Sequence, residues 1–290
     1  MAGPDPRPFS SDLSVGGFAL VRHAGVTALT QVMGCDIRVA QDTLPPIAEQ
    51  PIITRPGLER CFDETRRTAF DRLAQEAERA GANAVLGVRR LPAAIEFERD
   101  RRRGRGRTTS LYVQSAVDYQ LIGTAVHDPA LPAGRSAAST LSAEAYYKLK
   151  TAGRRPVGVV GGCGFAWWDS TAAGSSRGSQ AGYAQLNYVS GELPFLGELY
   201  NTAWRRASER MLAEVAELGG DGVIAVQVEH ERHELEWEAP YIRSTGKPSR
   251  DSFPHHGLLV GCRMLGTAVI AAGTPAHQVP MLVLGLGDRR

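Results

Sequence analysis

The sequence predicts an α+β protein made of two tandem β-α-β-β repeats, each with one helix packed on an antiparallel sheet. Three observations support this fold class. Short motifs recur in the same order in both halves, an amphipathic helix precedes a strand in each half, and a returning strand alternates apolar and polar residues. With 290 residues in all, each repeat has the length of a small domain.

Recurring motifs show that the sequence contains two repeats and how they align. Gly34-Cys35 recurs as Gly162-Cys163, residues 81–85 recur as 219–223, and residues 123–126 recur as 266–269. The order is kept while the offset grows from 128 to 143 positions, so the second copy has longer loops. We therefore expect one fold present twice rather than a catalytic domain beside an accessory one.

Each repeat contains one helix with an apolar stripe. We expect the helices to begin near Asp63 and near Asn201, because both residue types accept hydrogen bonds from the free amides of a first turn. Gly81 and Gly219 follow the helices, where a left-handed residue commonly ends a helix. The stripe consists of Ala69, Leu73 and Ala77 in the first repeat and Ala207, Met211 and Val215 in the second.

The strands follow the helices. Residues 84–88 and 223–228 are apolar runs of strand length. In the returning strand, Val117, Tyr119 and Leu121 share one face, whereas Asp118 and Gln120 lie on the other. This alternation predicts an antiparallel sheet that is exposed on one side.

The chain divides into five segments. We expect a disordered N-terminus at 1–13, the repeats at 14–128 and 141–273, a Pro/Gly-rich linker at 129–140, and an apolar tail at 274–290. The tail carries Met281, Leu282 and Leu284. Since these side chains would be an aggregation hazard in water, we predict that the tail docks on a sheet edge or in a neighbour's groove.

Composition limits the classes of partner. A net charge of +2 gives no reason to expect nucleic acid, and no run reaches the roughly 20 apolar residues of a membrane-spanning helix. Four cysteines are too few for a disulfide scaffold, and the N-terminus does not have the pattern of a signal peptide. We expect a cytoplasmic protein without a membrane partner.

The motif at residues 81–88, Gly-Ala-Asn-Ala-Val-Leu-Gly-Val, is closed by Gly-Thr-Ala-Val at 123–126. This combination resembles the YbjQ-like family, which is also described as heavy-metal-binding. The resemblance implies a dodecin-like β-α-β-β subunit that assembles into a ring, usually a pentamer. A tandem chain departs from that pattern: five chains would form two stacked rings, or both repeats would alternate within one larger ring.

Cys35 and Cys163 are the first metal-ligand candidates, because both repeats keep a thiol at one place. A thiolate suits a thiophilic or transition metal ion, and a ring would gather one thiol per subunit. One thiol per repeat does not complete a structural zinc site, which has four ligands. The alternative is that each cysteine is a small buried hydrophobic residue beside close-packed glycines.

The acidic hairpin of the second repeat offers further ligands. Strand alternation places His230 on the opposite face from Glu231 and His233. Either Glu231 or His233 could join His255 or His256 on the returning arm. The alternative is a solvated hairpin tip with no metal.

The basic run at the hairpin tip of the first repeat includes Arg101, Arg102 and Arg103. Three interpretations remain open: a solvated loop, pairing with the acidic hairpin between repeats or neighbouring chains, and binding of phosphate backbones. The run has no interleaved aromatic residues, which disfavours single-stranded nucleic acid.

No catalytic constellation is present in the sequence, so we do not expect an enzyme. A single β-α-β-β unit has only one helix to cover its sheet, which leaves an apolar face and edges to be buried by neighbours. The leading hypothesis is a non-enzymatic, ring-forming scaffold or binding protein with a metal or small-ligand site in the lumen. The alternative is a soft heavy-metal-binding protein that uses Cys35 and Cys163 or the His/Glu hairpin.

Overall fold

The computed structural model describes residues 10–44, 52–91, 96–100, 111–131, 137–169, 194–242 and 248–271. Within these residues the chain is α+β, with four helices and two sheets, which confirms the predicted class. The predictions for residues 1–9, for Arg101, Arg102 and Arg103, and for the tail lie outside the described residues. So do the side chains of His255 and His256.

The two sheets have similar strand orders. Sheet A consists of β1 (Thr27–Leu44), β5 (Leu111–His127), β3 (Ala84–Arg90) and the short β6 (Ala137–Ala138), in that order, with β4 (Glu96–Asp100) also paired to β5. Sheet B consists of β2 (Ile52–Thr54), β7 (Arg154–Asp169), β9 (Pro248–Ala271) and β8 (Gly222–Ile242). The order β1-β5-β3 corresponds to β7-β9-β8, and these pairings are antiparallel.

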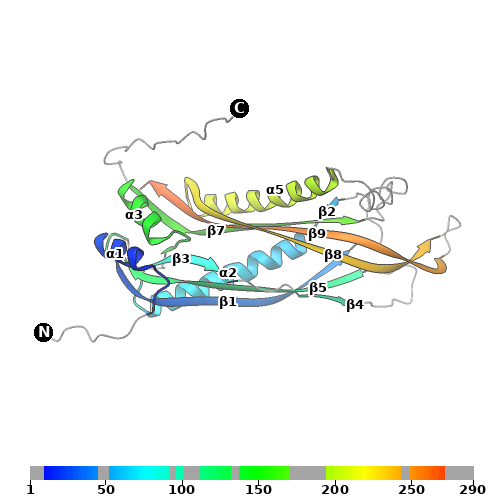
Figure 1. Ribbon diagram of the computed structural model, residues 1–290, viewed down its shortest axis with the longest axis horizontal. Coiled ribbons are helices and arrows are strands. Elements are labelled where there is room, and N and C mark those ends of the chain that lie inside the picture. The colour runs from blue at the N-terminus through cyan, green and yellow to red at the C-terminus, as the bar shows by residue number, and fades with distance from the viewer. Residues whose placement is uncertain are drawn as a thin grey trace, which may run out of the picture.

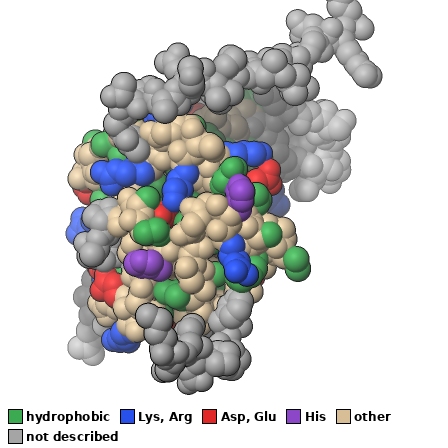
Figure 2. All heavy atoms as spheres, turned by 90° about the vertical axis from the view of Figure 1, so that its left-hand side faces the viewer, with side chains coloured by type: hydrophobic (Ala, Val, Ile, Leu, Met, Phe, Trp, Pro, Cys, Tyr) green, Lys and Arg blue, Asp and Glu red, His purple; other side chains and the backbone are tan. Residues whose placement is uncertain are grey.

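The helices and sheets alternate in layers (Figure 1). Sheet A lies on one side of α2 (Pro56–Arg79), sheet B lies on the other side, and α5 (Pro194–Glu217) covers the far face of sheet B. The short helices α1 (Val15–His23) and α3 (Ala143–Thr151) lie together at one end. That end presents interspersed basic, histidine and hydrophobic side chains (Figure 2).

The long helices begin earlier than the sequence predicted. They start at Pro56 and Pro194, about two turns before Asp63 and Asn201. Proline fits a first turn because its missing N–H has no helical partner there. Asp63 is instead an internal residue of α2 that faces sheet B, so the predicted N-caps at Asp63 and Asn201 are wrong.

The sequence analysis did not predict α1 and α3. Each begins with a serine N-cap: the Ser14 hydroxyl accepts a hydrogen bond from the Gly17 amide at 3.0 Å, and the Ser142 hydroxyl accepts one from Ala145 at 3.2 Å. The predicted alternation of β5 is confirmed, because Val117, Tyr119 and Leu121 are buried in the core that includes α2.

Glycines bring each long helix onto its sheet. A Cβ on Gly34 would lie 2.1 Å from the Ala69 carbonyl oxygen of α2, and a Cβ on Gly162 would lie 2.1 Å from the Ala207 carbonyl oxygen of α5. Backbone atoms cannot move aside as a flexible side chain can. The Gly-Cys motif therefore contains the contact point between helix and strand in both halves.

We expect Gly162→Ala to lower the free energy of unfolding by about 1–3 kcal/mol or more, because the new methyl group would overlap the α5 backbone. Gly16→Ala is the matched control, since a Cβ on Gly16 of α1 meets nothing within 4 Å. That control should be neutral or stabilising by up to ~1 kcal/mol. Denaturant unfolding measures both, and equal stabilities would contradict the close-approach explanation.

Residues 137–141, which fall mostly in the predicted linker, are packed between the two sheets. The Ser139 amide donates to the Val85 carbonyl at 2.8 Å, and the Thr140 amide donates to the Thr267 hydroxyl at 2.8 Å. The end of the predicted disordered lead makes a corresponding contact, since the Asp12 amide donates to the Thr124 hydroxyl at 3.1 Å. Both segments are therefore anchored by a threonine on the central strand of a sheet.

No helix in the described part of the chain is long and apolar enough to cross a membrane.

Candidate functional site

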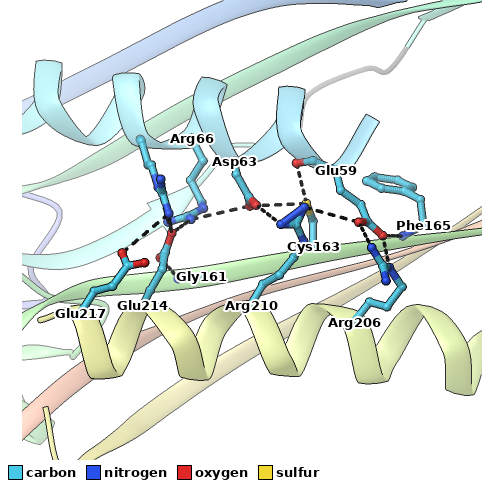
Figure 3. Close-up of polar contacts among 11 residues, drawn as sticks. Glu59, Asp63, Arg66, Gly161, Cys163, Phe165, Arg206, Arg210, Glu214 and Glu217 are labelled. Atoms are coloured by element: carbon cyan, nitrogen blue, oxygen red, sulfur yellow. Dashed lines mark hydrogen bonds and ion pairs between the residues drawn. The ribbon is translucent and has the colours of Figure 1, made fainter. Parts of the chain in front are cut away.

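The largest described ion cluster lies between α2 and α5, beside the part of β7 that precedes its pairing with β2 (Figure 3). We call it the interhelical network. Because Gly161, Gly162 and Gly164 of β7 have no side chains, both helices can approach this strand closely. The network consists of Glu59, Asp63, Arg66 and Arg67 from α2 and Arg206, Arg210, Glu214 and Glu217 from α5.

Glu59 closes one end of the network. Its side chain is fully buried, and it accepts hydrogen bonds from the Phe165 amide at 3.2 Å and from Arg206 Nε at 2.6 Å and Nη2 at 2.5 Å. Arg210 Nη2 lies 3.4 Å from the same carboxylate. Glu59 thus binds the Phe165 amide of β7, which lies just before the residues that pair with β2.

Glu214 closes the other end. It accepts hydrogen bonds from the Gly161 amide at 3.0 Å, from Arg67 Nε at 3.1 Å and from the buried Arg66 guanidinium. Burial acts to raise the pKa of Glu214, but the charge and hydrogen bond of Arg66 outweigh it, so the pKa is lowered. The pKa of Arg66 is raised, because Glu214 outweighs the opposing effect of burial.

The lowered pKa of Glu214 predicts acid sensitivity of this contact. A carboxylate whose pKa is lower in the folded state stabilises the fold above its unfolded value of 4.5, and the stabilisation is lost as the pH falls through the lower folded value. We expect the stability gap between wild type and Glu214→Gln to narrow on acidification through this range. Denaturant titrations from pH 7 to pH 3 measure it, and a constant gap would contradict the assignment.

Cys163 lies in the middle of the network. Its Sγ lies 3.3 Å from the Glu59 carbonyl oxygen and 3.5 Å from Asp63 Oδ1, so its one hydrogen is shared between these two acceptors. Asp63 also pairs with Arg210 at 3.2 Å. Burial, with the nearby Asp63 charge, raises the pKa of the Cys163 thiol well above its usual range. Because metals bind the thiolate, this environment disfavours metal binding at Cys163.

Cys35 has a different environment. It lies opposite Gln120 on sheet A, as Cys163 lies opposite Arg263 on sheet B, but its side chain is exposed on the face turned away from α2. The structure does not bring the two predicted thiol ligands together. Among the described residues, no group of three or more His, Cys, Asp or Glu side chains is placed to hold a metal ion.

The His/Glu hairpin follows the predicted alternation. His230 contacts the rings of Tyr200 and Trp204 on α5, whereas His233 Nε2 lies 3.6 Å from Glu231 on the other face of β8. Arg263 Nη2 is 3.1 Å from the same Glu231 carboxylate, which is therefore already paired with a cation. The backbones of His255 and His256 pair with β8 opposite Trp237 and Glu236.

The outer face of sheet A has an apolar stripe along β1, made of Met33, Cys35, Ile37 and Val39, beside the polar Asp118 and Gln120 of β5. Among the described residues, no helix lies against this face. Met33 is 42% exposed, Ile37 65% and Val39 61%. The corresponding face of sheet B is buried under α2 and includes Cys163, Phe165 and Trp167. The two sheets therefore differ in which of their faces has a helix against it.

The interhelical network was not predicted from the sequence. Its signal was present as charged residues three or four positions apart on each helix, at Glu59, Asp63 and Arg66 and at Arg206, Arg210 and Glu214. This spacing places side chains on one helix face. Only the packing of α2 and α5 against the same strand brings the two sets together.

Comparison with known proteins gives one family match. Residues 55–98, which run from the start of α2 into β4, match the YbjQ-like family model described as "Putative heavy-metal-binding". No curated protein and no solved structure matches the chain. The segment that supplies Glu59, Asp63, Arg66 and Arg67 to the network is thus similar to the YbjQ-like family. The resemblance predicted for the first repeat is confirmed over residues 55–98.

Proposed function

We propose that this protein is a non-enzymatic scaffold that assembles with copies of itself into a closed ring, and that its halves are tandem copies of one β-α-β-β unit. The correspondence of β1-β5-β3 with β7-β9-β8 supports the duplication. So do the paired close approaches at Gly34 and Gly162. The YbjQ-like segment at 55–98 supports the proposal only through the resemblance, which implies a ring-forming subunit.

One observation carries the proposal: the apolar β1 stripe on the outer face of sheet A has no described helix against it, whereas the corresponding face of sheet B is buried under α2. A contiguous exposed apolar patch on a soluble domain commonly marks an interaction site. A closed ring would bury this face in every copy, and it would enclose a lumen lined by repeated side chains where a metal or small ligand could bind.

Sedimentation equilibrium of the full chain tests the assembly. We expect a discrete multiple of the 31.2 kDa chain mass at micromolar concentration. A stable single chain over the same concentration range would contradict the scaffold.

A soft-metal-binding function is the second candidate. It is favoured by the description of the matched family and by the exposed thiol of Cys35. Elemental analysis of protein purified without a histidine tag distinguishes the two functions. Stoichiometric metal that disappears in Cys35→Ser with Cys163→Ser would establish the metal-binding function, and metal-free assembled protein would leave the scaffold alone.

A further inference from the structure

We infer that α5 of one copy docks on the outer face of sheet A of a second copy, in the place that α2 occupies on sheet B within a single chain. This inference rests on the proposed assembly and assigns its contact surfaces. The partner is a second copy of this chain, because the intramolecular contact of α2 with sheet B provides a template for both surfaces.

The template is a helix-on-sheet contact with a polar rim. Phe62 of α2 packs against Phe165 of β7 with ring centroids 5.2 Å apart, and the Arg263 guanidinium lies over the Phe62 ring at 5.4 Å. Asp63 lies beside Cys163 at 3.5 Å. The contact therefore combines an aromatic centre with a thiol at its edge.

The side of α5 with Tyr200, Asn201 and Trp204 presents the corresponding positions; Tyr200 is half-buried against sheet B, and both aromatic rings also contact His230 of β8. Both helices have 24 residues, so they correspond from Pro56 and Pro194 onwards. Tyr200 takes the place of Phe62, Asn201 that of Asp63, and Trp204 that of Arg66. Trp204 is 45% exposed and Leu212 is 56% exposed on this helix. Large apolar side chains on a solvent-facing helix surface are typical of a docking site.

The outer face of sheet A presents the other half of the contact. Ile37 takes the place of Phe165, Val39 that of Trp167, and Cys35 that of Cys163. Ile37 and Val39 keep the apolar character of the template while being the most exposed residues of β1 among the large hydrophobics. The exposed Trp204 and the half-buried Tyr200 of α5 are therefore chemically matched to the apolar stripe of this face.

Both surfaces, sheet A and α5, also have charged residues at the rim of the inferred contact. In the template, Glu214 accepts from the Gly161 amide and pairs with Arg67 of the covering helix. At the corresponding place in sheet A, Glu76 accepts from the Met33 amide at 3.4 Å. The residue of α5 that corresponds to Arg67 is Arg205, which is exposed and would reach Glu76 of the second copy.

The edge strand β8 of sheet B gives a second, independent indication of this contact between copies. In sheet A, Val88 of β3 is fully buried and its amide donates to the Ser139 carbonyl at 2.9 Å. The corresponding Val226 of β8 is 39% exposed. The segment that corresponds to Ser139 and Thr140 is Ser11 and Asp12, which already lies on Thr124 of sheet A. When α5 covers sheet A of a second copy, residues 11–13 of that copy are placed to pair with the β8 edge.

The two docking surfaces lie on opposite sides of the molecule, so the contact runs head to tail (Figure 1). Such heterologous contacts close into rings when the rotation between copies allows it. Within one chain, α2 of the first half covers sheet B of the second half, and in the inferred contact α5 of the second half covers sheet A of the next copy. Both halves therefore alternate around one ring, whereas two stacked rings of five would place the two halves in separate rings.

A cysteine crosslink tests the contact. The template places Asp63 beside Cys163, so Asn201→Cys should lie beside the native Cys35 of the next copy. Treatment of the full-length variant with a short bismaleimide should produce ladders of covalent dimers and higher species. The crosslink should be lost in Asn201→Cys with Cys35→Ser. Ala213→Cys, exposed on another side of α5, is the matched control and should give at least tenfold less product.

The outcomes separate the inference from the proposed function. An oligomer that crosslinks through Asn201→Cys and Cys35 supports both. An oligomer with no such product, or with equal product from Ala213→Cys, overturns the docking of α5 on sheet A and leaves the scaffold standing. A single chain in sedimentation, with no crosslink, overturns both.

Discussion

Ile37→Asp should convert the assembly into single chains that remain folded. Ile37 is 65% exposed in the single chain, so the substitution costs the isolated fold little apart from the repulsion by Asp118, which lies directly opposite on β5. In the proposed contact the aspartate would be buried beneath α5 without a cation opposite it, which is costly. We expect the apparent dissociation constant to rise at least ~100-fold, about 2.7 kcal/mol, as measured by sedimentation.

Val15→Asp is the matched control for this prediction. Val15 is 90% exposed on α1 and belongs neither to α5 nor to the outer face of sheet A, so the same change should leave the contact between them intact. Circular dichroism should give native spectra for both variants. If Ile37→Asp assembles as tightly as Val15→Asp, the outer face of sheet A is not an interface.

Glu214→Ala should lower the free energy of unfolding by about 3 kcal/mol. The substitution removes the carboxylate that pairs with Arg66, whose side chain is only 5% exposed, and it leaves a buried guanidinium with only the more distant Asp63 at 3.7 Å. Breaking a buried ion pair by removing one partner is strongly destabilising, because the other charge stays away from water. Denaturant unfolding with and without Glu214→Ala, both in the Ile37→Asp background that is expected to be a single chain, measures the loss without a contribution from assembly.

Glu217→Ala is the control within the same network. Glu217 is 68% exposed and lies 3.9 Å from Arg67, so its removal should change stability by less than ~0.5 kcal/mol. Equal effects of the two substitutions would show that the network does not act as a buried clamp between α2 and α5.

The fold class could be predicted because it depends on local patterns. The apolar stripe through Ala69 and Leu73 and the alternation through Val117 and Leu121 each repeat with the period of a helix or strand. The predicted starts of α2 and α5 were wrong. Asp63 is a residue type that often caps helices, but here it lies inside α2, where its side chain contacts Arg210 and Cys163. A residue's capping propensity does not reveal its partners in space.

The candidate site could not be predicted because it depends on long-range packing. Glu59 and Arg206 are far apart in sequence and meet only because both long helices contact β7. The equivalence of Cys35 and Cys163 was readable from the motif, but their opposite exposure was not. That difference follows from the layer order, in which α2 covers one sheet and no described helix covers the corresponding face of the other.

A cryo-EM class average of the full-length protein, viewed down its symmetry axis, tests the central claim most directly. We expect a closed ring in which sheets and long helices alternate, with two of each per chain and hence an even total. Each sheet A should have α5 of the adjacent copy on its outer face. Particles of single-chain size, or rings in which sheet A meets anything other than α5, would contradict the account.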